Sequence, residues 1–256
     1  MSDVSRKLQR MLSAPRVASI TAYDYVSARL ADEAGLDLIL VGDSLGMVVA
    51  GYENTTFVTM EHMVYHTEIA ARAVRNALLA SDLPYHSYLE PSQAVTNAKR
   101  LVQAGAEAVK LEGGEVIAPQ IRAILEASIP VIGHLGMLPQ SIVQEKGYRK
   151  KGKTSQEAAQ LEKDALLLQD LGVSAIVLEC VVPDVAARIT ASLQIPTIGI
   201  GSGPGCRGEI AVFHDVIGAF PWFHPPFAVA RADAAAIISQ ALTGYAAQAR
   251  MVTPPR

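Results

Sequence analysis

The sequence predicts an α/β protein folded as a (βα)8 TIM barrel. Eight short apolar, β-branched runs recur along the 256 residues, and stretches with helical periodicity lie between them. Strand followed by helix, repeated, produces parallel strands buried on both faces, which accounts for their nearly continuous apolar character. Eight is the number of strands that closes such a barrel, and an open doubly wound sheet is the alternative.

In chain order, the expected strands cover residues 17–24, 36–44, 76–84, 106–114, 129–136, 173–180 and 195–203, with a less distinct eighth at 210–215. Crossover helices are expected at 26–35, 92–105 and 154–172. The last begins with a capping-box pattern, Thr154 three residues before Glu157, and ends at Gly172. A short N-terminal helix is expected, and a final helix over 231–249 precedes a loose tail. No linker divides the chain, so residues 1–256 are expected to form one domain.

Composition excludes several classes of protein. Half of the residues are hydrophobic, which is enough for a sizeable core, and the net charge of −3 gives no electrostatic footprint for nucleic acid. The basic stretch 148–153 is short and isolated. The two cysteines, Cys180 and Cys206, have no metal-ligand spacing, and the N-terminus has no apolar signal region. A reduced, cytoplasmic compartment is therefore expected, without a membrane-spanning segment.

Polar residues end most of the apolar runs, always at the carboxyl end: Tyr23, Asp24, Asp43, Ser44, Asp82, Lys110, Glu112, His134 and Glu179. In a βα barrel this end carries the active site, because the last inward side chains of several strands converge there. Taken alone, each residue has a simpler interpretation. An Asp after a strand is often a helix N-cap, a lone His is often a core residue, and Lys110 with Glu112 can form a structural ion pair.

Carboxylates on four strands, Asp43, Asp82, Glu112 and Glu179, would repel one another at low dielectric, and one lysine is too few to compensate them. Oxygen ligands without thiolates favour a hard cation, most naturally Mg²⁺. Asp43, Asp82 and Glu112 are the expected metal residues. Glu179 lies on the other side of the carboxyl end of the barrel, here called the mouth, and has the position of a general base. Lys110 would meet an anionic substrate group. The glycines of 199–205 suit either a phosphate cradle or close packing at the barrel rim.

Five stretches together resemble the ketopantoate hydroxymethyltransferase family: "VGDSLGMVV", "DLPYHSY", "VKLEGG", "IPVIGHLGMLPQSI" and "IPTIGIGSGPGCRGE". The similarity runs from about residue 16 to residue 220. The resemblance implies a (βα)8 barrel, a Mg²⁺ site and a homo-oligomer, commonly a homodecamer. It also implies transfer of a one-carbon unit from 5,10-methylenetetrahydrofolate to 3-methyl-2-oxobutanoate, a step of pantothenate biosynthesis.

Carried over by position, the resemblance implies that Asp43, Asp82 and Glu112 belong to the metal site and that Glu179 is the proton acceptor. It places Asp43, Ser44, Asp82, Lys110 and His134 around the oxo acid. Three segments depart from the family pattern and are expected near the mouth or at subunit contacts: 146–151, with Lys146, Lys150 and Lys151; 207–209; and the chain after residue 220. The alternatives are a C–C lyase or mutase of the phosphoenolpyruvate mutase and isocitrate lyase type, and a paralogue that binds without catalysis.

Overall fold

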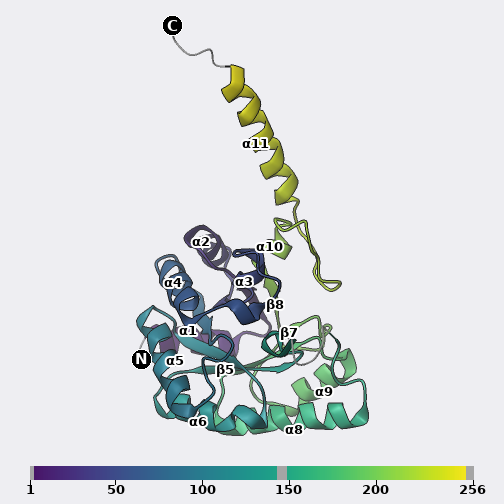
Figure 1. Ribbon diagram of the computed structural model, residues 1–256. Coiled ribbons are helices and arrows are strands. Elements are labelled where there is room, and N and C mark those ends of the chain that lie inside the picture. Colours follow the sequence, from purple (N-terminus) through teal and green to yellow (C-terminus); the bar gives the residue numbers. More distant parts are fainter. Residues whose placement is uncertain (1–2, 143–148, 252–256) are drawn as a thin grey trace. The chain divides into compact units, whose positions relative to one another are not determined.

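The computed structural model describes residues 3–142 and 149–251. The chain divides into two compact units, Met1–Ile210 and Ala211–Arg256. The first unit contains a closed parallel barrel whose strands follow one another in sequence order, with helices around the sheet (Figure 1). The predicted (βα)8 barrel is confirmed, and the open doubly wound sheet is excluded because the sheet closes on itself. The expectation of a single domain over 1–256 stays a prediction.

Each predicted apolar run contains or overlaps a strand. The strands are β1 (Val17–Thr21), β2 (Leu38–Val41), β3 (Leu78–Asp82), β4 (Ala108–Glu112), β5 (Val131–Gly136), β6 (Ala175–Glu179), β7 (Thr197–Ile200) and β8 (Gly208–Val212). The eighth strand was expected over 210–215, but it begins at Gly208 and a short helix, α10 (Phe213–Val216), follows it directly. The register pairs Asp82 with Lys110 and Glu112 with His134 across neighbouring strands, so these polar positions lie at one level of the barrel.

The helices of the first unit are α1 (Asp3–Ser13), α2 (Tyr25–Glu33), α3 (Leu45–Val48), α4 (Met60–Ala71), α5 (Pro91–Gln103), α6 (Ala118–Glu126), α8 (Ser155–Leu171) and α9 (Pro183–Ser192). Short 3₁₀ turns are η1 (Thr55–Phe57), η2 (Glu115–Ile117) and η3 (Pro139–Ser141). The hydroxyl of Thr154 caps α8 by accepting the Glu157 N–H at 3.1 Å. The predicted capping box is only half correct, because the Glu157 carboxylate accepts from the Lys153 N–H instead of that of Thr154.

Every second strand residue points into the barrel, and near the beginnings of the strands these inward side chains are apolar. Leu38, Leu78, Ala108 and Ile132 belong to one buried cluster, together with residues from the other strands. Met11 of α1 is fully buried in the same cluster. Helix α1 also reaches the segment before β3, where the Arg10 guanidinium donates to the Asn76 carbonyl at 2.8 Å. The N-terminal helix therefore closes the end of the barrel at which the strands begin.

The segment 207–209 lies at that same closed end and not at the mouth, while the other expectation for it, a subunit contact, stays a prediction. The Arg207 guanidinium donates to the Leu12 carbonyl at 2.6 Å, and the Arg207 carbonyl accepts from the Val17 N–H at 2.9 Å. A Cβ on Gly208 would meet the Val17 carbonyl oxygen at 2.7 Å. Arg207 and Gly208 therefore lie where β8 meets β1 and the barrel closes. At Gly208 the two backbones approach too closely for a side chain.

The second unit consists, in its described part, of α10 and α11 (Ala234–Met251) joined by a loop. Helix α11 begins near the predicted residue 231, and the Asp233 carboxylate accepts the Ala236 N–H at 3.1 Å at its first turn.

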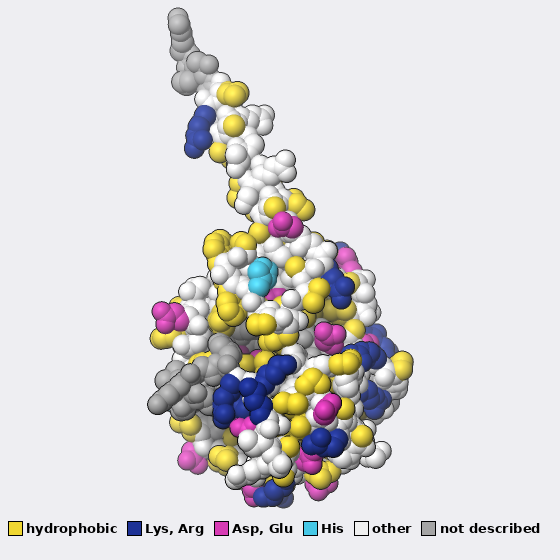
Figure 2. Space-filling model, turned by 90° about the vertical axis from the view of Figure 1, so that its right-hand side faces the viewer, with side chains coloured by type: hydrophobic (Ala, Val, Ile, Leu, Met, Phe, Trp, Pro, Cys, Tyr) yellow, Lys and Arg dark blue, Asp and Glu magenta, His cyan; other side chains and the backbone are white. Residues whose placement is uncertain are grey.

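None of the helices in the described ranges has the length and apolar character needed to cross a membrane. The face in Figure 2 shows acidic and basic side chains interspersed, with one small group of Lys and Arg.

Candidate active site

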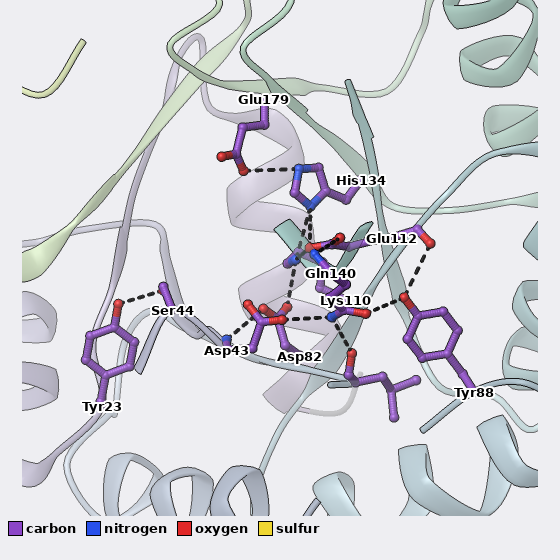
Figure 3. Close-up of polar contacts among 11 residues, drawn as sticks. Tyr23, Asp43, Ser44, Asp82, Tyr88, Lys110, Glu112, His134, Gln140 and Glu179 are labelled. Atoms are coloured by element: carbon purple, nitrogen blue, oxygen red, sulfur yellow. Dashed lines mark hydrogen bonds and ion pairs between the residues drawn. The ribbon is translucent and has the colours of Figure 1, made fainter. Parts of the chain in front are cut away.

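Along the inward positions of the strands, apolar side chains in the interior of the barrel are followed by polar side chains at the mouth. On β3 the inward positions Leu78 and Ala80 are followed by Asp82. The same alternation on the next strands brings in Lys110 and Glu112 from β4, His134 from β5 and Glu179 from β6. Asp43 lies two residues after the end of β2 and is 4% exposed. The structure therefore gathers these six predicted residues in one place (Figure 3).

The Lys110 ammonium lies at the centre of the group. Its Nζ is 3.1 Å from Asp82 Oδ1 and 3.7 Å from Glu112 Oε1, and it reaches His134 Nδ1 at 3.2 Å. Burial alone would lower the pKa of Lys110, but the carboxylates of Asp82, Glu112 and Asp43 outweigh it and raise this pKa. Lys110 is therefore a permanent cation, and the ion pair with Glu112 exists within a larger cluster.

The two aspartates form a close pair of acids. The Asp43 N–H donates to Asp82 Oδ2 at 3.0 Å, which keeps the loop after β2 beside the end of β3. Burial, with the Glu112 charge second, raises the pKa of Asp43 to about 6. Burial raises the pKa of Asp82 to about 8 even though Lys110 opposes the shift. Lys110 therefore does not compensate the whole negative charge of the cluster.

His134 connects the lysine to Glu179. Its Nε2 is 3.3 Å from Glu179 Oε2, on the opposite side of the ring from Lys110. Burial and the nearby Lys110 charge lower the pKa of His134 to about 4, so the ring is neutral near pH 7. Nδ1 also lies 3.4 Å from Glu112 Oε1, so a carboxylate faces each ring nitrogen. The Lys110 ammonium can only donate, and its closer contact of 3.2 Å favours the tautomer in which Nδ1 accepts and the hydrogen lies on Nε2, facing Glu179. Burial raises the pKa of Glu179, and the hydrogen bond from His134 opposes that shift.

Ser44 and Tyr23 lie on another side of the mouth. The Tyr23 hydroxyl is 2.8 Å from Ser44 Oγ and 2.6 Å from Thr21 Oγ1. Ser44 precedes α3 and is next to Asp43 in the chain, so its position follows from that of the aspartate. Asp24 is not part of the site, because its carboxylate accepts the N–H groups of Val26 and Ser27 at the start of α2. For Asp24, the simpler N-cap interpretation was the correct one.

Gln140 is a buried site residue to which sequence reasoning assigned no role. It lies on η3 after β5, is 3% exposed, and its Nε2 donates to Asp43 Oδ2 at 2.8 Å. Its backbone N–H donates to Glu112 Oε2 at 3.1 Å, and its Oε1 accepts from the Tyr88 hydroxyl at 2.6 Å. Beside it lies a cavity of about 210 Å³ whose wall includes Glu112, Tyr85 and Tyr88. This cavity therefore adjoins the polar mouth on the side of the loop that follows β3.

A divalent cation fits the donor chemistry of this mouth. Three buried carboxylates lie around one ammonium, and burial first, with the neighbouring carboxylates second, raises the pKa values of Asp43 and Asp82. Within 3–142 and 149–251, no three His, Cys, Asp or Glu side chains converge closely enough to hold a metal by themselves. Mg²⁺ needs only one or two carboxylates and keeps several waters. The donor chemistry of Asp43 and Asp82 is therefore compatible with such a cation.

The glycine-rich loop after β7 is closely packed, which supports the packing interpretation. A Cβ on Gly203 would meet Pro183 at 2.9 Å, and one on Gly205 would meet Ala187 at 2.8 Å, both on α9. The Ser202 hydroxyl donates to the Leu178 carbonyl at 2.7 Å and accepts from the Val181 N–H at 3.0 Å. This loop therefore holds the end of β6, which carries Glu179, against the start of α9.

The basic stretch 149–153 reaches the mouth end of β6. The Lys151 N–H donates to the Cys180 carbonyl and the Lys151 carbonyl accepts from the Val182 N–H, both at 2.9 Å. Arg149 pairs with Glu157 at 3.4 Å. The expectation that this segment lies near the mouth is correct for its described part, and Lys146 falls outside the described residues.

Comparison with known proteins adds a family and a fold. The sequence model described as Ketopantoate hydroxymethyltransferase matches residues 4–256. The chain is 51% identical to the 3-methyl-2-oxobutanoate hydroxymethyltransferase of Moorella thermoacetica, over 92% of this chain and 88% of that protein. It is 48% identical to the protein of the same name from Chloroflexus aggregans, over 100% and 92%.

Solved structures with the same fold are more distant in sequence. A phosphonopyruvate hydrolase in complex with oxalate and Mg²⁺ matches with a TM-score of 0.67 at 15% identity, over 97% of this chain and 87% of that chain. A phosphoenolpyruvate phosphomutase from Streptomyces platensis subsp. rosaceus matches with a TM-score of 0.68 at 15% identity, over 98% and 92%. At this level of identity the likeness concerns the fold alone.

Proposed function

The chain belongs to the ketopantoate hydroxymethyltransferase family of one-carbon transferases, and on this premise we propose the chemistry of its barrel mouth. The protein enolises 3-methyl-2-oxobutanoate there and joins it to the one-carbon unit of 5,10-methylenetetrahydrofolate, giving ketopantoate for pantothenate biosynthesis. The observation that supports this chemistry is the line of Lys110, His134 and Glu179, which places a fixed cation and a buried carboxylate on opposite sides of one imidazole ring.

Glu179 is the proposed general base. The C3–H of a 2-oxo acid is a weak acid, so its removal needs a carboxylate whose basicity is greater than that of an exposed glutamate. Burial raises the pKa of Glu179, which increases this basicity, and the His134 N–H keeps the carboxylate in one orientation. A side-chain exposure of 13% leaves Glu179 accessible from the mouth, whereas His134 beneath it is 2% exposed.

Lys110 is the proposed partner of the negative charge of the substrate. The Lys110 ammonium is held by Asp82 and is oriented to receive the carboxylate or the enolate oxygen of the oxo acid. Ser44 Oγ, held by the Tyr23 hydroxyl, is the neutral donor for the same substrate. When bound, Mg²⁺ supplies Lewis-acid stabilisation of the charge that develops on the substrate oxygens. Asp43 and Asp82 would hold it directly, and Glu112 through water.

Bond making follows proton removal. The C3 proton moves to the Glu179 carboxylate, and the electron pair of the C3–H bond forms the enolate. C3 then attacks the methylene carbon of the folate-derived iminium ion, a C–C bond forms, and the π electrons of the C=N bond return to nitrogen. The oxygen of water finally bonds to that carbon as the C–N bond breaks, and a proton of the water goes to the nitrogen, which releases the hydroxymethyl product and tetrahydrofolate. The base, the fixed cation and the neutral donor that these steps require are all among the described residues of the mouth.

The test separates enolisation from transfer. Purified protein with Mg²⁺ and 3-methyl-2-oxobutanoate in D₂O should exchange the C3 proton, followed by NMR, and addition of methylenetetrahydrofolate should yield ketopantoate. Exchange without product would indicate that folate is not the second substrate. No exchange and no product, with or without metal, would contradict the proposed chemistry and would favour the paralogue that binds without catalysis.

The lyase or mutase alternative has no support from the residues of this chain. Such enzymes usually use a cysteine on a flexible loop as an acid. Cys180 and Cys206 are the two cysteines of the sequence, and both are buried. Burial raises the pKa of the Cys180 thiol to about 11. A substrate panel of 2-methylisocitrate, oxaloacetate and phosphonopyruvate tests this alternative directly.

Assembly and location are carried over from the family as proposals. A homodecamer is the expected assembly, and light scattering of the purified protein would measure it. A cytoplasmic location suits the proposed use of reduced folate, and fractionation of cells tests it.

A further inference from the structure

Gln140 ties together the carboxyl ends of three strands. Its Nε2 donates to Asp43 Oδ2 after β2 at 2.8 Å and to the Leu83 carbonyl after β3 at 3.0 Å. Its backbone N–H donates to Glu112 Oε2 at the end of β4 at 3.1 Å. One residue therefore holds one oxygen of each of two acids of the cation site.

Asp43 and Leu83 determine which way the Gln140 amide faces, and the Tyr88 hydroxyl matches that orientation. A carboxylate and a backbone carbonyl only accept hydrogen bonds, so the amide nitrogen must face Asp43 and Leu83. The amide oxygen then faces Tyr88, whose hydroxyl donates to it at 2.6 Å (Figure 3). The flipped amide would place its oxygen against two acceptors and its NH₂ group against the hydroxyl. The Tyr88 hydroxyl thus supports the one orientation in which Gln140 can hold Asp43.

We propose that Gln140, oriented by Tyr88, is a positioning residue for the divalent cation, a role that rests on the proposed function. By taking one oxygen each of Asp43 and Glu112, Gln140 fixes which oxygen of each carboxylate faces the cation. It also keeps the loop after β2 against the end of β3, where Asp82 lies. Loss of an outer partner of a metal-site residue typically weakens metal binding by about 10- to 100-fold.

The test measures binding of Mn²⁺ as the probe, by calorimetry and by electron paramagnetic resonance, with and without 3-methyl-2-oxobutanoate. The variants are Tyr88→Phe, which removes only the hydroxyl, and Gln140→Met, which keeps the length of the side chain. The control is Gln120→Met on α6, because Gln120 is also a buried glutamine that lines the same cavity, but its side chain donates to the Leu89 carbonyl at 3.0 Å and holds none of the acids.

We expect Tyr88→Phe and Gln140→Met to bind Mn²⁺ about 10- to 100-fold more weakly than wild type, with Gln140→Met the weaker of the two and Gln120→Met unchanged. At saturating Mn²⁺, the kcat of both variants should return to within a few-fold of wild type. A general loosening of the mouth would instead lower kcat at every Mn²⁺ concentration.

Equal Mn²⁺ affinity in wild type, Tyr88→Phe and Gln140→Met would overturn the role of Gln140, and so would a kcat defect that saturating Mn²⁺ does not relieve. If circular dichroism shows that Gln140→Met is unfolded, Tyr88→Phe decides the question alone. Absence of Mn²⁺ binding by the wild-type protein, even with the oxo acid, would overturn the cation site of the proposed function and this role with it. The two failures are therefore distinguishable.

Discussion

His134 Nε2 lies 3.3 Å from Glu179 Oε2, while Nδ1 of the same ring lies 3.2 Å from Lys110 Nζ (Figure 3). A neutral imidazole in this position accepts from the cation and donates to the carboxylate. The ring therefore orients Glu179 without adding a charge of its own. The geometry assigns His134 a positioning role beside the substrate contact implied by the family resemblance.

Replacing Glu179 by Gln should abolish C3 proton exchange while leaving the fold and oxo-acid binding nearly intact. Glutamine has the same size, but it cannot accept the proton, and loss of a general base typically costs about 10²- to 10⁴-fold in rate. Exchange is followed by NMR in D₂O, and oxo-acid binding by calorimetry. Exchange at the wild-type rate would assign the proton transfer to another group.

Replacing His134 by Leu should move the acidic limb of the pH–rate profile of C3 exchange to higher pH. The hydrogen bond from His134 lowers the pKa of Glu179, so its loss raises that pKa, and the base then needs a higher pH to ionise. His134→Gln keeps an acceptor and a donor on one side chain and serves as the matched control, with a smaller displacement. An unchanged acidic limb in His134→Leu would show that the ring does not act on Glu179.

Replacing Asp82 by Asn should abolish activity yet raise the stability of the metal-free protein at alkaline pH. The pKa of Asp82 is about 8 in the folded protein, above the usual unfolded value of about 3.9. The folded state therefore binds more protons between these values, and wild type loses stability as pH rises through this window. An asparagine side chain does not titrate, so the stability of the Asp82→Asn variant relative to wild type should increase from about pH 5 to about pH 8.5.

The measurement for Asp82→Asn is denaturant unfolding with EDTA at both pH values. Asp170→Asn, at an exposed position on α8, is the control and should show no such change. A relative stability of Asp82→Asn that falls with pH would contradict the buried-charge argument.

Replacing Asp32 by Asn should have the opposite pH signature. The buried Asp32 carboxylate accepts the N–H groups of Arg75, Asn76 and Ala77 at 3.1, 2.8 and 2.7 Å. Burial tends to raise its pKa, but these hydrogen bonds outweigh burial and lower it. Its stabilisation is therefore complete above the unfolded pKa and is lost as pH falls through the folded value.

For Asp32→Asn we expect a loss of about 1.5–3 kcal/mol at pH 7, the usual contribution of hydrogen bonds to a charged group. This corresponds to a decrease in Tm of roughly 3–12 °C for a chain of this size. The difference from wild type should shrink below about pH 4. A difference that is constant with pH would indicate that the carboxylate charge plays no part.

The barrel could be predicted because the signals for it are local. Apolar runs bounded by turns identify strands wherever they occur, and each of β1 to β7 lies within the longer run predicted for it. The eighth strand was misplaced because its start depends on a backbone contact between Gly208 and Val17, which are far apart in the sequence. The segment 207–209 was expected near the mouth or at a subunit contact, because a loop residue such as Arg207 carries no pattern that indicates the end of the barrel on which it lies.

The sequence by itself determined that Asp82, Lys110, Glu112, His134 and Glu179 enter the mouth, because alternation along a strand is a property of neighbouring residues and the same parity that buries Ala80 points Asp82 inward. Asp43 lies in the loop beyond β2, where strand alternation does not place it. Only the tertiary structure decided how these side chains are connected. Gln140 meets Asp43, Leu83 and Glu112 across separations of 97, 57 and 28 residues, and no local pattern encodes such contacts. The tertiary structure likewise decided the surroundings of His134, because it brings Lys110 and Glu112 to Nδ1 and Glu179 to Nε2.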